Sequence, residues 1–187
     1  MTNTAADPSR LGYVGKTSGR DSDSWFTPSV YIDAARSVLG GIGLDPFSSV
    51  EANEVVKAES FMTIDDDSLA PARWVCPAGR PTVWMNPPYG GSLVRQAANK
   101  FLEEFKAGSF ERAVVLVNNA TETKMFQALL REASAVCFTD HRIAFWNSDG
   151  KQVSGNTRGQ AFLYFGAEPA RFASEFEGFG FTTEINS

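Results

Sequence analysis

Residues 83–90 read Val83-Trp84-Met85-Asn86-Pro87-Pro88-Tyr89-Gly90 and combine a buried apolar run with a proline turn. The apolar run Thr82–Met85 predicts a buried strand. Two prolines then end it, because proline cannot donate a ladder hydrogen bond and because it holds the preceding Asn86 extended. The strand therefore stops in a stiff turn, and in an open α/β sheet strand ends of this kind line the ligand crevice.

The turn presents chemistry that suits the exocyclic amine of a nucleobase. Such an amine must lose conjugation with its ring before its nitrogen can attack an electrophile. The Asn86 side-chain oxygen and the Pro87 carbonyl can accept its hydrogens, and Tyr89 offers a flat face to the base. Stacking of this kind is worth about 1–3 kcal/mol per base in single-strand binding proteins. The alternative is a structural turn in which Asn86 caps the strand and Tyr89 only packs.

The strand followed by Asn-Pro-Pro-Tyr resembles the catalytic motif of amino-group DNA methyltransferases. The wider pattern resembles the small phage-type DNA adenine-N6 methyltransferases, over roughly residues 22–166. Four segments carry this resemblance in the order of the family: Ser24-Trp25-Phe26-Thr27-Pro28, Leu44-Asp45-Pro46-Phe47-Ser48-Ser49, Asn86-Pro87-Pro88-Tyr89 and Arg142-Ile143-Ala144-Phe145. A glycine-bearing loop and a final strand follow the fourth segment.

The resemblance implies an enzyme that transfers a methyl group from S-adenosylmethionine to the N6 amine of an adenine flipped out of double-stranded DNA. Asn86, Pro87, Pro88 and Tyr89 would be its catalytic residues. Direct displacement at the sulfonium methyl depends on orientation of N6 rather than on a strong base. The resemblance also implies that the enzyme protects a phage genome from host restriction.

Strands and helices alternate through most of the chain, which predicts an α/β domain with a mostly parallel sheet. We expect a Rossmann-like S-adenosylmethionine-dependent methyltransferase fold that closes with a terminal antiparallel hairpin. The predicted strands are 42–47, 61–64, 82–85, 113–117, 135–139 and 160–165, and the predicted helices are 28–39, 51–59, 93–105, 121–133 and 169–176. Thr27 and Thr121 are the expected caps of two helices. A single domain over 23–187 would follow a flexible N-terminal arm, 1–22.

The first predicted strand ends at candidate donor-binding residues. Asp45 and Pro46 lie there, and a carboxylate in this place can hold the ammonium of the donor directly or through water. Ser48 is small enough for close backbone approach, although many methyltransferases carry a glycine-rich loop here. The alternative for Asp45 is a turn cap. The resemblance adds Asn86 to the donor-binding residues, and it adds walls around the methionine end of the donor, which are Trp25, Thr27 and Pro28.

Three adjacent acids, Asp65-Asp66-Asp67, follow the second predicted strand. They do not alternate as the ligands of a calcium loop do, so no metal site is predicted. A solvated turn in which Asp67 or Ser68 caps a helix is the favoured interpretation. The resemblance adds a hydrogen bond from the adenine or ribose of the donor to Asp66 or Asp67.

Candidate DNA contacts lie near the end of the chain. Lys151 and Arg158 are natural phosphate contacts, Asn156 can reach a base edge, and Arg142 could steer the substrate backbone. The alternative is a flexible surface loop over 147–159. The single histidine, His141, receives no catalytic role. After Gly166 the chain carries Phe172, Phe176, Phe179 and Phe181, and the helix predicted over 169–176 is expected to pack its aromatic residues on the sheet.

The net charge of −5 is unusual for a nucleic-acid-binding protein, because phosphate binding depends on lysine and arginine. A local basic patch, weak binding or a substrate other than a polynucleotide would each explain it. A non-catalytic DNA-binding or interaction module of the same fold stays open, as does a methyltransferase that acts on RNA or protein. Without a signal segment, a long apolar run or metal-type cysteine spacing, we expect a soluble cytoplasmic protein, in the host cytoplasm if phage-encoded.

Overall fold

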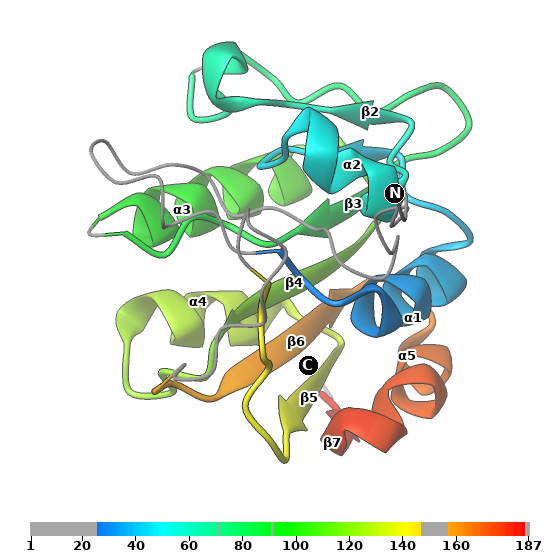
Figure 1. The fold of residues 1–187 in the computed structure, drawn as a ribbon, viewed down its shortest axis with the longest axis vertical. Coiled ribbons are helices and arrows are strands. Elements are labelled where there is room, and N and C mark those ends of the chain that lie inside the picture. Colours follow the sequence, from blue (N-terminus) through cyan, green and yellow to red (C-terminus); the bar gives the residue numbers. More distant parts are fainter. Residues whose placement is uncertain (1–25, 71, 91, 147–156, 186–187) are drawn as a thin grey trace, which may run out of the picture.

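The computed structural model describes residues 26–70, 72–90, 92–146 and 157–185. Within these ranges seven strands form one sheet in the order β2-β1-β3-β4-β6-β5-β7 (Figure 1). The strands are β1 (Leu44–Asp45), β2 (Ser60–Phe61), β3 (Thr82–Met85), β4 (Arg112–Asn118), β5 (Ala135–Thr139), β6 (Gln160–Phe165) and β7 (Gly180–Glu184). The helices are α1 (Ser29–Leu39), α2 (Val50–Val56), α3 (Leu93–Lys106), α4 (Lys124–Glu132) and α5 (Pro169–Phe176). The predicted arm, 1–22, and its boundary with the domain lie outside the described residues.

The sheet combines parallel and antiparallel pairs. Strand β1 is parallel to both β2 and β3, and β3 is parallel to β4. Strand β6 runs antiparallel between β4 and β5, and β7 is antiparallel to β5 at the edge. The pairing of β5 with β6 is the antiparallel hairpin expected from the sequence. The result is a mixed α/β fold whose parallel strands end at one common edge.

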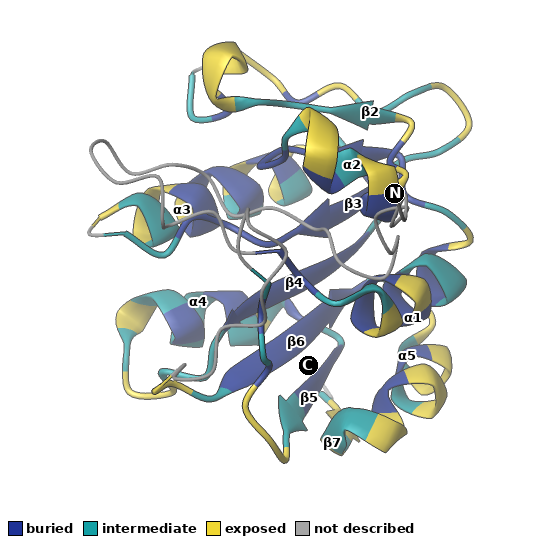
Figure 2. Ribbon diagram, viewed as in Figure 1, coloured by how far each residue is buried: buried dark blue, intermediate teal, exposed yellow. Residues whose placement is uncertain are grey.

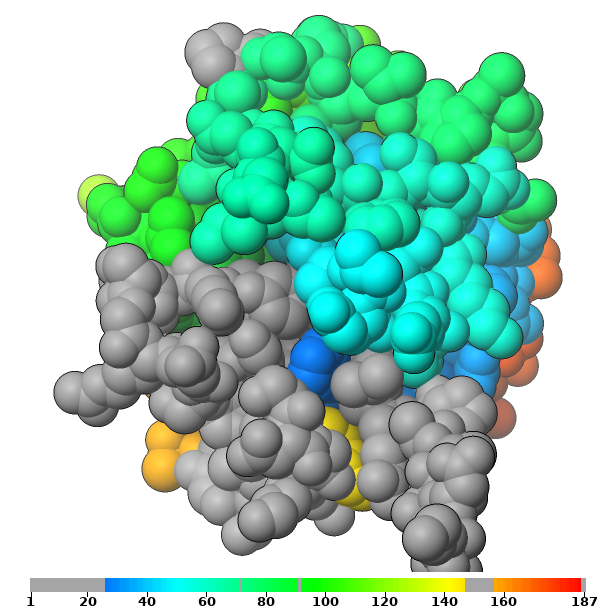
Figure 3. Space-filling view, turned by 45° about the horizontal axis from the view of Figure 1, so that its top comes forward, coloured from blue at the N-terminus to red at the C-terminus, as the bar shows by residue number. Residues whose placement is uncertain are grey.

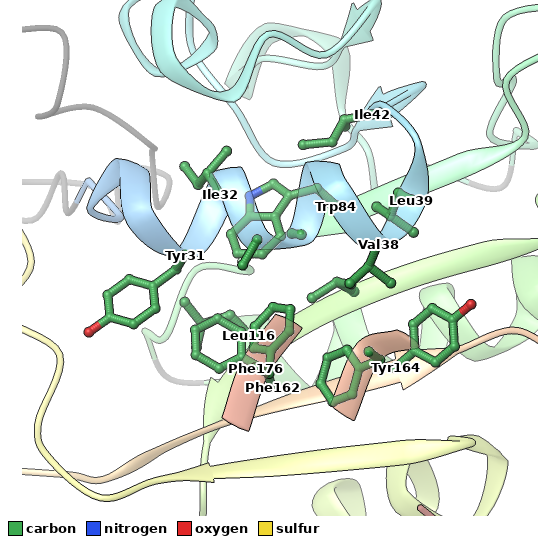
Figure 4. Packing of buried hydrophobic residues seen from close by; sticks show 14 of the residues in the cluster. Tyr31, Ile32, Val38, Leu39, Ile42, Trp84, Leu116, Phe162, Tyr164 and Phe176 are labelled. Atoms are coloured by element: carbon green, nitrogen blue, oxygen red, sulfur yellow. The ribbon is translucent and has the colours of Figure 1, made fainter. Parts of the chain in front are cut away.

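Strand β3 is buried along its whole length because helices cover both faces of the sheet. On one face Trp84, Leu116 and Phe162 share an apolar cluster with α1 and α5 (Figure 4). On the other face Met85 and Val115 pack with residues of α3 and α4. Figure 2 shows the buried central strands between these two helical layers. Among the described residues no helix combines the length and the apolar character that crossing a bilayer requires.

A buried ion pair holds the connection before β3 on helix α3. The Lys100 ammonium lies 2.7 Å from Glu104 Oε1 and donates to the Ala72 carbonyl at 2.8 Å. Both charged side chains are largely buried, and the Trp74 indole nitrogen donates to the Ser68 carbonyl at 2.9 Å in the same connection. These contacts fix the segment that leads the chain into the central strand.

The first helix cap differs from the prediction. Helix α1 starts at Ser29, Pro28 takes the N-cap position, and no side chain caps the helix. Thr27 therefore does not cap it, because its hydroxyl accepts a hydrogen bond from Asn86 instead. The strand predicted over 42–47 is also shorter, since after Asp45 the chain meets Pro46, which has no N–H for the ladder.

Two further predicted caps are wrong. Thr123 rather than Thr121 caps α4, where its hydroxyl accepts from the Phe126 amide at 3.2 Å. Asp67 and Ser68 start no helix in the described chain. Instead Thr63 caps the 3-10 helix Ile64–Asp66, and Asp67 follows it with a φ of 45°. The aspartates form an exposed turn, as the sequence predicts, but the capping residue is Thr63, which precedes them.

Strand β7 was not predicted, because its sequence is polar and short and it lies at the sheet edge. Its Phe181 is 71 % exposed, whereas Phe172 and Phe176 are fully buried and Phe179 packs partly against them. The expected packing of the aromatic residues of the final helix is therefore confirmed for Phe172 and Phe176, whereas Phe181 of β7 faces solvent. The exposure of Phe181 is explained by the position of β7 at the sheet edge, where a strand has one neighbour. Alternate side chains of a strand point to opposite faces, so some side chains of β7 can face solvent.

Replacing Phe176 with alanine should lower the free energy of unfolding by about 3–5 kcal/mol, the usual cost for a buried phenylalanine. Its ring lies 5.0 Å from that of Phe162 and 4.3 Å from that of Phe172, between centroids. The matched variant Phe181→Ala should change it by no more than about 0.5 kcal/mol, because its side chain is exposed. Equilibrium urea unfolding measures both values, and equal losses would contradict the packing described above.

Candidate active site

The carboxyl ends of the parallel strands bring three polar residues to one edge of the sheet. Asp45 ends β1, Asn86 follows β3, and Asn118 ends β4, and these strands are neighbours. The segment before α1 joins this edge, because Thr27 is hydrogen-bonded to Asn86. Figure 3 shows the start of the described chain, in dark blue, against the cyan segment around α2. The residues before α1 therefore join the edge at which the sequence predicts ligand-binding residues.

Asn86 is almost completely buried, with 1 % of its surface exposed. Its side-chain nitrogen donates to Thr27 Oγ1 at 3.0 Å. Its side-chain oxygen, Oδ1, is also buried, and no group in the described part of the chain donates to it. A buried acceptor without a donor is costly unless a ligand satisfies it. The amide is thus held by its nitrogen, and its oxygen remains available for a hydrogen-bond donor other than the described residues.

The rest of the turn is rigid. Pro87 and Pro88 are both buried, directly after the central strand. Tyr89 is half-buried, and its hydroxyl donates to the Leu116 carbonyl of β4 at 3.2 Å. Burial raises the pKa of Tyr89 well above its ordinary value, so the phenol stays neutral. The hydroxyl contact anchors the Tyr89 ring to the neighbouring strand.

Asp45 is a buried carboxyl group with 1 % of its surface exposed. Its Oδ1 accepts from the Phe47 amide at 3.2 Å, whereas Oδ2 has no donor among the described residues. Burial raises the pKa of Asp45 from 3.8 to about 7, although the Phe47 amide and the Ser48 hydroxyl oppose this. The Ser48 hydroxyl is itself buried and makes no hydrogen bond of normal geometry to the described residues. Asp45 and Ser48 together leave two buried oxygens at the end of β1, beside the buried Pro46.

These oxygens are concentrated at the predicted edge. Five buried side-chain polar atoms lack a hydrogen-bond partner in the described ranges, and three of them belong to Asp45, Ser48 and Asn86. Buried polar atoms are normally paired, so a cluster of unpaired oxygens at strand ends is typical of a ligand site. The oxygens can accept from an ammonium, a hydroxyl or an amine.

Asp66 and Asp67 lie beyond the carboxyl end of β2, on the solvent side of the same edge. The Asp66 carboxylate accepts from the Thr63 amide at 2.7 Å and from the Thr63 hydroxyl at 2.8 Å. These bonds hold the pKa of Asp66 below its ordinary value. Both aspartates are exposed, in contrast to Asp45.

The predicted DNA contacts are only partly within the described chain. Arg142 and Arg158 are exposed on the two segments that flank the loop after β5. Lys151 and Asn156 lie outside the described residues, as does Trp25. Sequence reasoning missed Gln160, a buried residue that joins these two segments to the tip of β4.

Gln160 makes three hydrogen bonds from its buried amide. Its nitrogen donates to Asn118 Oδ1 at 3.2 Å and to the Arg158 carbonyl at 2.9 Å. Its oxygen accepts from the Ile143 amide at 3.3 Å. A polar residue at the start of an otherwise apolar strand was the available sequence signal. The bonds place both arginine-bearing segments beside the candidate site.

His141, to which the sequence assigns no catalytic role, makes side-chain contacts to two residues. Its Nε2 lies 2.7 Å from the Tyr31 hydroxyl, and its Nδ1 lies 2.6 Å from Asp140 Oδ1. It therefore connects helix α1 to the segment that follows β5.

Comparison with protein families places this geometry in a known context. The family described as DNA N-6-adenine-methyltransferase (Dam) has a model that matches residues 15–174. A search of the curated proteins finds no match to the chain. The family match covers far more than half of the 187 residues, including Asp45, the Asn-Pro-Pro-Tyr turn and Arg142. The chain therefore belongs to the DNA N-6-adenine-methyltransferase (Dam) family and is an adenine-specific DNA methyltransferase.

Proposed function

We propose that the edge formed by β1, β3 and β4 holds S-adenosylmethionine beside an adenine flipped from double-stranded DNA, in a Rossmann-like fold. The observation that carries this proposal is the buried Asn86 Oδ1, which no described residue satisfies. An adenine N6 amine is a donor that fits it. The neighbouring Pro87 carbonyl can take the second N6 hydrogen, as the sequence predicts.

The unpaired oxygens at β1 fit the methyl donor. S-adenosylmethionine carries an ammonium group, and the buried Asp45 carboxyl can pair with it directly or through water. Ser48 lies in the segment that follows Asp45, and its hydroxyl can contact the same donor. Pro46 forms part of the wall of this donor site. Trp25, Thr27 and Pro28 around the methionine end, and Asp66 or Asp67 at the adenosine end, stay predictions.

The chain's own residues then act by orientation. The donor supplies an electrophilic methyl group. Asn86 and the Pro87 carbonyl draw the N6 hydrogens out of the ring plane, which localises the nitrogen lone pair toward that methyl. When bound, S-adenosylmethionine would supply its methyl group to N6, with S-adenosylhomocysteine as the leaving group and one N6 proton released to solvent. Positioning of this kind can supply a large share of the rate acceleration.

Tyr89 and the arginine-bearing segments complete the proposed substrate site. The Tyr89 ring, held through its hydroxyl on β4, offers a flat face on which the flipped base stacks. Arg142 and Arg158, with Lys151 and Asn156 between them in the sequence, contact the DNA. Protection of a phage genome in a host cytoplasm, which the resemblance implies, stays a prediction of biological role.

Asn86→Ala should slow methyl transfer to a low but measurable rate and leave the affinity for S-adenosylhomocysteine nearly unchanged. Loss of one acceptor that acts in the transition state costs about 10²–10³ in rate. The assay is transfer of labelled methyl groups to an adenine-containing duplex, with calorimetric titration of S-adenosylhomocysteine as the binding control. A near-normal rate for Asn86→Ala would remove the basis of the mechanism.

Donor affinity should fall as the pH drops below the Asp45 pKa of about 7. Only the carboxylate pairs with an ammonium, so the dissociation constant should rise about tenfold for each pH unit well below that pKa. The pH dependence of folding stability has the opposite sign to that of donor affinity. The folded-state pKa lies above 3.8, so the free protein should lose stability as the pH rises from about 4 to about 7.

The control for this pH dependence is Asp45→Asn, which keeps the shape but does not titrate. It should bind S-adenosylhomocysteine weakly at every pH between about 5 and 8, and its unfolding free energy should lose the dependence assigned to Asp45. An unchanged pH profile in Asp45→Asn would assign the titration to another group.

Arg158→Ala should weaken duplex binding and make the slope of log K against log salt shallower by about 0.9, the value for one lost phosphate contact. The matched control is Arg131→Ala. Arg131 is also exposed but lies at the end of α4 that is remote from the site edge. Fluorescence anisotropy at several salt concentrations measures both variants, and equal slopes in the two would place Arg158 outside the DNA interface.

A further inference from the structure

We propose that Thr27 is a positioning residue for Asn86, which lets the Asn86 oxygen face the target amine. This inference rests on the proposed function of Asn86. The Thr27 hydroxyl lies 3.0 Å from Asn86 Nδ2, although 59 positions separate the two residues in the sequence. Thr27 is fully buried, and Asn86 is 1 % exposed.

Thr27 is needed because the Asn86 side-chain amide has a hydrogen-bond donor, Nδ2, and an acceptor, Oδ1. Rotation of the Asn86 amide by half a turn exchanges a donor for an acceptor at nearly the same place. When Oδ1 faces the N6 amine, Nδ2 must point into the protein, where an unpaired N–H group is costly. Thr27 Oγ1 supplies the acceptor that Nδ2 requires there. In the reactive orientation of the Asn86 amide, Nδ2 is therefore not left as an unpaired buried donor.

The backbone around Thr27 is fixed on both sides. Before it, Phe26 forms a two-way bridge with Trp146, with N–O distances of 2.7 and 3.0 Å. After it, Pro28 has a restricted φ and begins helix α1. A side chain held in this manner is pre-organised, so little ordering is required when substrate binds.

The Thr27 hydroxyl has no competing role as a helix cap. Pro28 occupies the N-cap position of α1, and no side chain caps that helix. A threonine before a helix usually supplies its hydroxyl to the first turn. Here the hydroxyl is turned toward the end of β3 instead, which is the arrangement that a role in positioning Asn86 requires.

A positioning role for Thr27 and its predicted role as a wall of the donor site affect different steps. A donor wall affects binding of S-adenosylhomocysteine. A positioning hydroxyl affects the rate of methyl transfer after both substrates are bound, because the amide orientation is needed only when N6 reacts. Single-turnover rates at saturating donor and duplex separate these two effects from product release.

The test compares Thr27→Val, which keeps the shape and removes the hydroxyl, with Thr27→Ser, which keeps the hydroxyl. We expect Thr27→Val to lower the single-turnover rate by about 10- to 100-fold, the loss typical of a misplaced reacting group. S-adenosylhomocysteine affinity should be unchanged, and Thr27→Ser should restore most of the rate. In the Asn86→Ala background, Thr27→Val should cause no further loss.

Three results would overturn the inference. These are a normal rate for Thr27→Val, an equal loss in Thr27→Ser, or a loss of S-adenosylhomocysteine affinity that accounts for the whole effect. The proposed function fails separately, if Asn86→Ala keeps a normal rate. If Thr27→Val does not fold, the wild-type side-chain amide protons of Asn86, assigned by NMR against Asn86→Ala, decide the question. Protection from exchange supports the bond, and rapid exchange excludes it.

Discussion

Burial of β3 on both faces is the constraint on which the rest of the structure depends. Helices α1 and α5 cover one face and helices α3 and α4 cover the other, so the strand is apolar from Val83 to Met85. Polar groups can then appear only where the strand ends. The prolines after Asn86 make that end abrupt, and the first polar side chain beyond the core is therefore held rigidly at the sheet edge.

The same burial explains why the unpaired oxygens at this edge are suited to binding a ligand. Asn86 and Asp45 are as inaccessible as core residues, yet each retains one oxygen without a donor from the described chain. Water-excluded polar atoms interact strongly with a ligand, and the energetic cost of their burial is met in folding rather than during the reaction. A methyl transfer that depends on orientation benefits from groups prepared in this way.

The acidic composition has a local explanation in the methyltransferase family. A net charge of −5 describes the whole chain, whereas the proposed DNA contacts lie at one edge of it. Arg142 and Arg158 flank that edge on segments that Gln160 ties to β4. Net charge thus affects nonspecific binding and the encounter rate, and it does not decide whether a particular site accepts DNA.

The sequence by itself determined the elements whose signals are local. Strands β3, β5 and β6 and helix α5 have the predicted bounds, because each is an apolar or periodic run that proline, glycine or a polar residue ends. Asn86 and Asp45 are candidate site residues that the sequence predicts, since each lies at the end of a strand. The Asn-Pro-Pro-Tyr turn also carried the family resemblance.

Contacts between residues that are distant in the sequence become apparent only in the folded chain. The bond between Thr27 and Asn86, the three contacts of Gln160 and the exposed position of Phe181 on β7 all depend on strand order and helix placement. Local patterns contain no information on such pairings, because a threonine before a helix or a polar strand start has the same sequence whatever lies opposite. The energy of packing both helical layers on one sheet selects these contacts.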